Sequence, residues 1–276
     1  MGVELDCLEA SVGNKSKHTI RSYIVQYKKL TALLEADICD SSEEKVIKFV
    51  KEQTSINSQQ ALLNIAIVVR RLHCMPTQKL ESNRESNKVA LVSQVKMKNA
   101  QIINNLPSLL DLQDYTQYLY DESKYTDYVI NFLLLNAYVR NQDLNFELVS
   151  LKRNTKNNDK NYMWLSKNKA TFIRNVYKTS GTYGKLVNVF TDRQLIIALR
   201  RIMACQNYNE DCGVFIPNEN QIGYYIKQAT FQGIGEAKYL KIIIDANRGN
   251  LQKLKEISDS RGTNIETLIS IFSENN

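Results

Sequence analysis

The chain has 276 residues and a net charge of +7, with 43% hydrophobic and 24% charged residues. This length suits one large domain or two modest ones with buried cores, and the composition is typical of a soluble globular protein. The longest apolar run, from Val129 to Val139, is too short to cross a bilayer and contains two asparagines. The N-terminus has no hydrophobic signal region. We therefore expect a soluble protein without a membrane partner.

The cysteine and histidine content argues against two kinds of site. The five cysteines are odd in number and scattered, without a C-x-x-C pair, and the only histidines are His18 and His73. Neither a disulfide framework nor a zinc site fits this pattern. We expect no metal, no cofactor and a reducing intracellular setting.

Helical spacing dominates the N-terminal part of the chain, where prolines and glycines are few. Apolar residues follow a helical period from Lys17 to Ala36 and from about Ser58 to Leu72. Between them, Ser41-Ser-Glu-Glu44 has the pattern of a helix start. The polar stretch from Thr77 to Lys88 predicts a break, and a further helix is expected from Val89 to Asn105.

The remainder of the chain combines helices with a short β region. The periodicity predicts helices at residues 111–119, 125–138 and 191–205 and from residue 218 to the end. Between them, β-rich segments occur at residues 162–165, 171–177 and 185–190. The sequence thus predicts a mainly α fold with a small antiparallel sheet of three strands, in two domains at 1–100 and 101–276.

The excess positive charge is concentrated in one segment. From Lys152 to Lys185 there are nine Lys or Arg residues and one acid, Asp159, a local net charge of +8 (9 − 1), so the rest of the chain is close to neutral. A concentrated basic segment in an otherwise balanced protein indicates a surface that binds a polyanion. The alternative is a solvated charged loop.

Several segments, in chain order, resemble the motifs of the tyrosine recombinases of the phage-integrase type. Ser16–Tyr27 resembles the first helix of their core-binding domain. Asn131–Leu144 resembles an apolar helix followed by the first arginine motif, with Arg140 as the arginine. Tyr177–Val189 resembles the hairpin that carries the catalytic lysine, which maps to Lys178. The resemblance implies a two-domain DNA-binding fold with a helical core-binding domain and a catalytic-type domain.

The other catalytic positions of that family are changed in this chain. The resemblance places a His-x-x-Arg box at residues 235–238, where Gly235 and Lys238 replace the histidine and the second arginine. The histidine of a later Gly-His pair is replaced by Thr263, and the nucleophilic tyrosine by Phe272. A phenylalanine ring has no hydroxyl to attack a phosphodiester, so we expect no strand cleavage and no enzyme activity.

The unchanged arginine and lysine still imply phosphate binding. Lys238 in place of an arginine would keep affinity for phosphate but lose bidentate orientation. The residues expected to contact DNA are Arg140, Lys152, Arg153, Lys156, Lys160, Lys167, Lys169, Arg174, Lys178, Lys185 and Lys238.

These observations favour a binder of double-stranded DNA with an architectural, packaging or genome-maintenance role, with oligomerisation on DNA left open. Abundant Asn, Lys and Ile fit an AT-rich genome, for which we consider a large DNA virus, with the protein in the nucleus, viral factory or virion. Two alternatives remain. One is a divergent active recombinase or topoisomerase with its nucleophile elsewhere or supplied in trans. The other is a helical protein-interaction or transcription-associated factor with an incidental basic segment.

Overall fold

The computed structural model describes residues 17–103, 106–205, 212–216 and 221–272, some of them by their backbone alone. The chain divides into two compact units, unit 1 at Met1–Ile103 and unit 2 at Asn104–Asn276. The sequence had suggested a boundary after residue 100. In the described ranges no helix is both long and apolar enough to cross a membrane.

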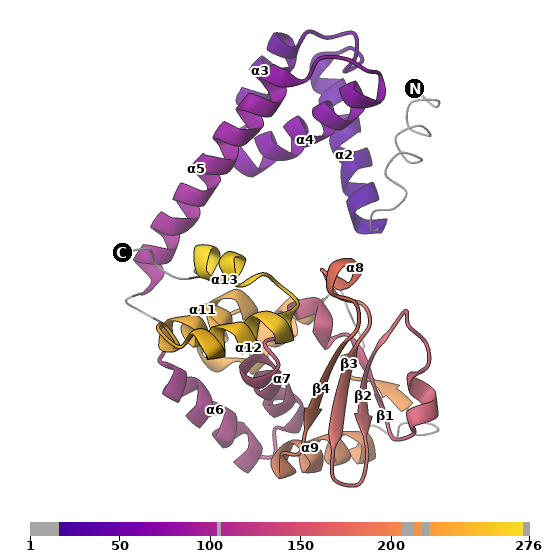
Figure 1. The fold of residues 1–276 in the computed structure, drawn as a ribbon, viewed down its shortest axis with the longest axis vertical. Helices are drawn as coiled ribbons and strands as arrows, with labels where there is room; N and C mark the ends of the chain where they lie inside the picture. The colour runs from indigo at the N-terminus through magenta and orange to yellow at the C-terminus, as the bar shows by residue number, and fades with distance from the viewer. Residues whose placement is uncertain (1–16, 104–105, 206–211, 217–220, 273–276) are drawn as a thin grey trace. The chain divides into compact units, whose positions relative to one another are not determined.

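Unit 1 is helical, and its other described helices pack against α4 (Ile56–Leu72) (Figure 1). These other helices are α2 (Lys17–Leu34), α3 (Glu43–Lys51) and α5 (Gln78–Ile103). Leu62, Leu63 and Ile65 of α4 are fully buried together with Leu30 of α2 and Val46 of α3. These periodic apolar positions are the ones that predicted the helices.

The predicted break at residues 77–88 is wrong, because α5 runs without interruption from Gln78. The helix start is stabilised by a side chain from another helix. The Glu43 carboxylate accepts hydrogen bonds from the backbone N–H groups of Lys79 and Leu80, each at 3.1 Å. A carboxylate at a helix N-terminus satisfies amides that have no partner within the helix. This contact joins residues 36 and 37 positions apart, so local polarity could not predict it.

Unit 2 contains a five-stranded sheet in the order β4-β3-β2-β1-β5. The strands are β1 (Phe146–Val149), β2 (Asn161–Leu165), β3 (Ala170–Arg174), β4 (Leu186–Phe190) and β5 (Cys212–Val214). The three predicted strands are β2, β3 and β4, and they are antiparallel. The expectation of a purely antiparallel, three-stranded sheet is wrong, because β1 pairs in parallel with β2 and β5 pairs with β1.

Helices cover one face of this sheet (Figure 1). The described helices of unit 2 are α6 (Leu109–Asp121), α7 (Tyr125–Asn136), α8 (Ser180–Tyr183), α9 (Arg193–Cys205), α10 (Ile222–Ala229), α11 (Glu236–Ala246), α12 (Leu251–Arg261) and α13 (Ile265–Phe272), with 3-10 helices η1 (Asn141–Leu144), η2 (Lys152–Thr155) and η5 (Phe231–Gly233). Of these, α8 lies in the connection between β3 and β4 and η2 in the connection between β1 and β2. Met163 and Phe172 point into the helical core, whereas Tyr162 and Ile173 form a small cluster on the other face. The fold of unit 2 is therefore helices packed on one side of a small mixed sheet.

Candidate nucleic-acid interface

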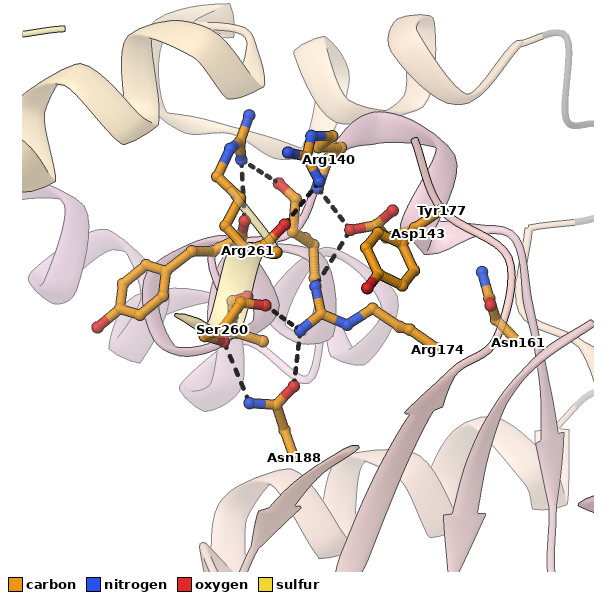
Figure 2. Close-up of polar contacts among 12 residues, drawn as sticks. Arg140, Asp143, Asn161, Arg174, Tyr177, Asn188, Ser260 and Arg261 are labelled. Atoms are coloured by element: carbon orange, nitrogen blue, oxygen red, sulfur yellow. Dashed lines mark hydrogen bonds and ion pairs between the residues drawn. The ribbon is translucent and has the colours of Figure 1, made fainter. Parts of the chain in front are cut away.

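Three arginines from distant parts of unit 2 meet beside the sheet (Figure 2). Arg140 precedes η1, Arg174 ends β3, and Arg261 ends α12. Arg174 is completely buried, Arg261 is 7% exposed, and Arg140 is half-buried. Buried cations need charged or polar partners. The partners of these three side chains show what holds the site together.

Arg174 connects β3 with three other segments. Its Nη1 lies 3.2 Å from Oδ2 of Asp143, and both side chains are fully buried. Its Nη2 donates to Oδ1 of Asn188 at 2.7 Å and to the carbonyl oxygen of Ser260. Asn188 in turn donates to the Ser260 hydroxyl at 3.1 Å. The guanidinium therefore fixes the end of α12 against β3 and β4.

Arg261 and Arg140 extend the same network. Arg261 forms an ion pair with Glu236 at the start of α11, and its Nη1 donates to the carbonyl oxygen of Tyr138 at 2.9 Å. Arg140 Nη1 donates to the carbonyl oxygen of Arg261 at 2.7 Å. Asp143 Oδ2 also accepts from the backbone N–H of Arg140 at 3.0 Å. We call these five residues, Arg140, Asp143, Arg174, Glu236 and Arg261, the arginine cluster.

The arginine cluster has more positive than negative groups. Three guanidiniums face two carboxylates, a formal excess of one positive charge (3 − 2). Burial lowers the pKa of Arg174, and burial followed by repulsion from Arg261 lowers the pKa of Arg140. Arginine side chains nevertheless remain protonated in proteins. The excess charge persists, and Arg140 is the arginine of the cluster closest to solvent.

The motif segments noted in the sequence come together around this cluster. The Thr179 hydroxyl, next to Lys178, donates to the carbonyl oxygen of Gly262. Gly262 has a left-handed φ of 59°, and a Cβ there would lie 2.7 Å from Cε2 of Tyr177. Glu236, which pairs with Arg261, belongs to the 235–238 box. The segments around residues 140, 178, 236 and 262 are thus neighbours, although they are distant in sequence.

The individual predicted catalytic positions have different surroundings. Lys178 and Lys238 are exposed, and Gly235 is the N-cap residue of α11. Thr263 is half-buried, and its carbonyl oxygen accepts a hydrogen bond from the Ser258 hydroxyl. Phe272 ends α13, and its side chain lies outside the described residues. Lys178 and Lys238 are thus open to solvent, whereas Arg174 and Arg261 are buried.

Arg174 was predicted to contact DNA, and this prediction is wrong. Its side chain has no exposed surface, and its partners come from the protein itself. The cause is strand alternation, since Arg174 shares the core face of β3 with Phe172 and Ala170. Arg174 contributes to the net charge of residues 152–185, but its side chain does not contribute to the basic surface of the protein.

The remaining cations of the basic segment do not form one continuous row. Lys167 and Lys169 lie in the turn between β2 and β3, whereas Lys178 and Lys185 lie in the connection between β3 and β4, at the opposite end of these strands. Lys152, Arg153 and Lys156 belong to the exposed crossover between β1 and β2, and Lys160 pairs with Glu147. The segment therefore supplies more than one basic surface.

Sequence reasoning missed Arg261 and its partner Glu236. A signal was present in α12, because Leu254, Ile257, Ser258 and Arg261 follow the spacing of one helix face and all are buried. An arginine on an apolar face needs an internal partner. That pattern could have identified Arg261 as a structural cation.

Two tyrosines lie near the arginine cluster, and neither has an activated hydroxyl. The Tyr177 hydroxyl donates to the carbonyl oxygen of Gly184 at 2.7 Å, and burial raises the pKa of Tyr177. Burial also raises the pKa of Tyr138. A nucleophile is activated by a lower pKa or an adjacent base. Residues 104–276 contain no histidine to act as that base.

Comparisons with known proteins give little further information. No protein-family model matches the chain, and no curated protein matches it. A solved structure described as "Crystal structure of XerA recombinase" aligns over 100% of this chain and 94% of that chain, with 11% sequence identity and a TM-score of 0.40. These values are too low to assign a fold, so the proposals below depend on contacts within this chain.

Proposed function

We propose that the chain binds the backbone of double-stranded DNA through the cations around the arginine cluster and does not cleave it. The observation that carries this proposal is the meeting of four separate segments at the cluster, with Lys178 and Lys238 exposed on two of them. The cluster itself has excess positive charge, and half-buried Arg140 brings part of it towards solvent.

The chemistry of these groups favours affinity without cleavage. Lysine ammonium groups and a half-buried guanidinium attract phosphate, but such contacts carry no base-sequence information. Transfer of a phosphoryl group to the protein also needs an in-line nucleophile and an acid for the leaving oxygen. The segment that follows Tyr239 contains neither tyrosine nor histidine. We infer a DNA-handling protein with an architectural or packaging role.

Equilibrium binding at several salt concentrations tests the proposal. Fluorescence anisotropy with two duplexes of unrelated sequence should give similar affinities in the micromolar range or tighter at low salt. If about four to six phosphates are neutralised, the slope of log K against log salt should be about −4 to −5. Absence of duplex binding, or affinity insensitive to salt, would contradict the proposal.

A pair of variants locates the surface. Lys178→Glu/Lys238→Glu should weaken binding to both duplexes about equally and make the salt slope less negative by roughly 2, because two phosphate contacts are lost. Lys124→Glu is the control, because Lys124 is exposed in the connection between α6 and α7, outside the basic segment. Equal loss from the control would show that the effect is only one of net charge.

A covalent-adduct assay tests the absence of cleavage separately. The unmodified protein incubated with nicked duplex substrates, which trap a covalent protein–DNA bond, should give no product that survives denaturing electrophoresis. A substantial adduct would overturn the non-catalytic part of the proposal and leave the DNA-binding part intact. Digestion and sequencing of that adduct would identify the nucleophile.

A further inference from the structure

A second group of exposed cations lies at the end of the sheet opposite the arginine cluster. Lys167 and Lys169 occupy the turn between β2 and β3, and Arg193, Arg200 and Arg201 lie on α9. Figure 1 shows α9 near this end of the sheet and α8 at the opposite end. We call these five residues the α9 surface.

Direct contact makes the turn and the helix one surface. Arg200 Nη2 donates a hydrogen bond to the carbonyl oxygen of Lys167. An open depression of about 530 Å³ lies between the two elements, lined by both of these side chains and by Ser150, Ser166 and Met203 among others. The Ser166 hydroxyl donates to the carbonyl oxygen of Lys169 at 3.1 Å, so Lys167 and Arg200 are the groups of this hollow that favour an anion.

The turn between β2 and β3 and helix α9 contain no acidic residue. Residues 165–170 and 193–205 contain five Lys or Arg residues and neither Asp nor Glu, a net charge of +5. Asp192 precedes α9, but its carboxylate caps the helix by accepting from the backbone N–H of Leu195 at 2.7 Å. Glu210 and Asp211 follow α9 in a segment outside the described residues. The described part of the α9 surface is therefore strongly basic.

The α9 surface is separate from the candidate interface at the arginine cluster. Leu165 and Ala170 pair beside the turn that carries Lys167, whereas Arg174 and Leu186 pair at the other end of the sheet. A strand of five residues spans about 16 Å. The α9 surface and the arginine cluster thus lie at opposite ends of the same strands.

We propose that the α9 surface is a second binding site for DNA phosphates, so that one copy of the chain can hold two duplex segments. This inference depends on the proposed function, because it assumes that the first duplex binds near the arginine cluster. A protein with one DNA-binding surface would coat a duplex. A protein with two such surfaces, at opposite ends of its sheet, would hold two separate duplex segments together.

The composition of the α9 surface favours nucleic acid over an acidic protein partner. Arginine guanidiniums bind phosphate through paired hydrogen bonds. Arg193 and Arg200 are seven residues apart on α9, which places them on the same side about 10 Å apart along the axis. Protein interfaces usually centre on buried aromatic or apolar anchors, and Lys167, Lys169 and the three arginines include none.

A capture experiment tests this second site. A biotinylated duplex on beads is incubated with the full chain and a fluorescent duplex at low salt, and the captured fluorescence is measured. The wild-type protein should retain the second duplex. Lys167→Glu/Arg200→Glu should bind a single duplex within about threefold of wild type but reduce capture at least tenfold. Thermal unfolding confirms that the variant is folded.

Three further variants separate the charge effect from other causes. Arg200 also holds the turn by a hydrogen bond, so Lys169→Glu/Arg201→Glu removes charge without removing that bond and should lose capture as well. Lys178→Glu/Lys238→Glu, at the first surface, should weaken single-duplex binding itself. Lys124→Glu should leave both measurements unchanged.

The outcomes distinguish this inference from the proposed function. If the wild-type protein binds no duplex, both are wrong. If it binds duplex but captures no second one, or if both α9-surface variants capture as well as wild type, only the second site is wrong. In the latter case, light scattering should reveal an oligomer in which each copy contributes one duplex.

Discussion

Both units bury arginine, but they neutralise it in different ways. In unit 1, Arg70 is 4% exposed and donates to backbone carbonyl oxygens, from Nε to Pro76 at 2.9 Å and from Nη1 to Ser41 at 2.7 Å. None of the hydrogen bonds found for it in the described residues goes to a carboxylate. In unit 2, Arg174 and Arg261 each have a carboxylate partner, Asp143 and Glu236.

The difference in partners follows from the number of buried cations at each site, one in unit 1 and several in unit 2. A single guanidinium can be satisfied by the carbonyl oxygens of the two connections that it joins, the one between α2 and α3 and the one between α4 and α5. Three neighbouring guanidiniums repel one another, and carbonyl dipoles alone do not offset that repulsion. In unit 2 the carboxylates therefore stabilise the folded state, and the same pairing withdraws Arg174 and Arg261 from any outside ligand.

The largest expected effect is that of removing Asp143. Asp143→Ala leaves the fully buried Arg174 without its carboxylate, and removal of one partner of a buried ion pair typically costs about 3–5 kcal/mol. Urea unfolding of unit 2 should show a loss of this size, whereas Asp159→Ala, at an exposed position, should cost less than about 0.5 kcal/mol. Asp143→Ala/Arg174→Met should be more stable than Asp143→Ala. If it is not, charge balance does not explain the cluster.

Arg70→Met should have a smaller effect on unit 1. It removes a donor from buried carbonyl oxygens but leaves no opposite charge unpaired, so about 1–3 kcal/mol is expected. Arg71→Met is the matched control, because the neighbouring Arg71 is exposed and pairs with Glu81 at the surface. A loss from Arg70→Met as large as that from Asp143→Ala would contradict the distinction between the two units.

Gly262→Ala tests the packing of the segment that follows Arg261. The left-handed φ of 59° and a Cβ contact of 2.7 Å with Tyr177 both oppose a side chain there. The left-handed backbone alone costs about 1–2 kcal/mol, and the contact adds to it. Gly181→Ala in α8 should be neutral or slightly stabilising, because no atom lies within 4 Å of its Cβ position. Equal stability of Gly262→Ala and Gly181→Ala would show that the backbone around residue 262 can shift to accommodate a side chain.

Much of the helical fold could be predicted because apolar periodicity is local. The buried face of α4, for example, is visible directly in the spacing of its apolar residues. The missed features depend on distant contacts. The start of α5 is stabilised by Glu43 from α3, and β1 and β5 are only four and three residues long. Such short strands acquire their identity from pairing rather than from composition.

The candidate site was predictable in outline and not in detail. Motif order placed the segments of Arg140 and Lys178 near one functional centre, and the structure brings them together through Arg261 and Gly262. A count of positive charges, however, cannot tell an exposed cation from a buried one. Strand alternation with Phe172 would have assigned Arg174 to the core. For Arg174, the sequence analysis used the charge of the side chain but not the face of the strand to which it points.

The smallest expected effect is that of Phe272→Tyr, which places a hydroxyl where the resemblance to the tyrosine recombinases implies a nucleophile. Phe272→Tyr alone should give no covalent adduct with a nicked duplex, because oriented donors and a proton donor are still lacking. Each such group is typically worth a few kcal/mol in the transition state. Two of the three clustered guanidiniums, those of Arg174 and Arg261, are already held by carboxylates. The best chance of an adduct is the quadruple variant Phe272→Tyr/Gly235→His/Lys238→Arg/Thr263→His. An adduct from Phe272→Tyr alone would show that Arg174 and Arg261 can still act on a phosphate despite their carboxylate partners.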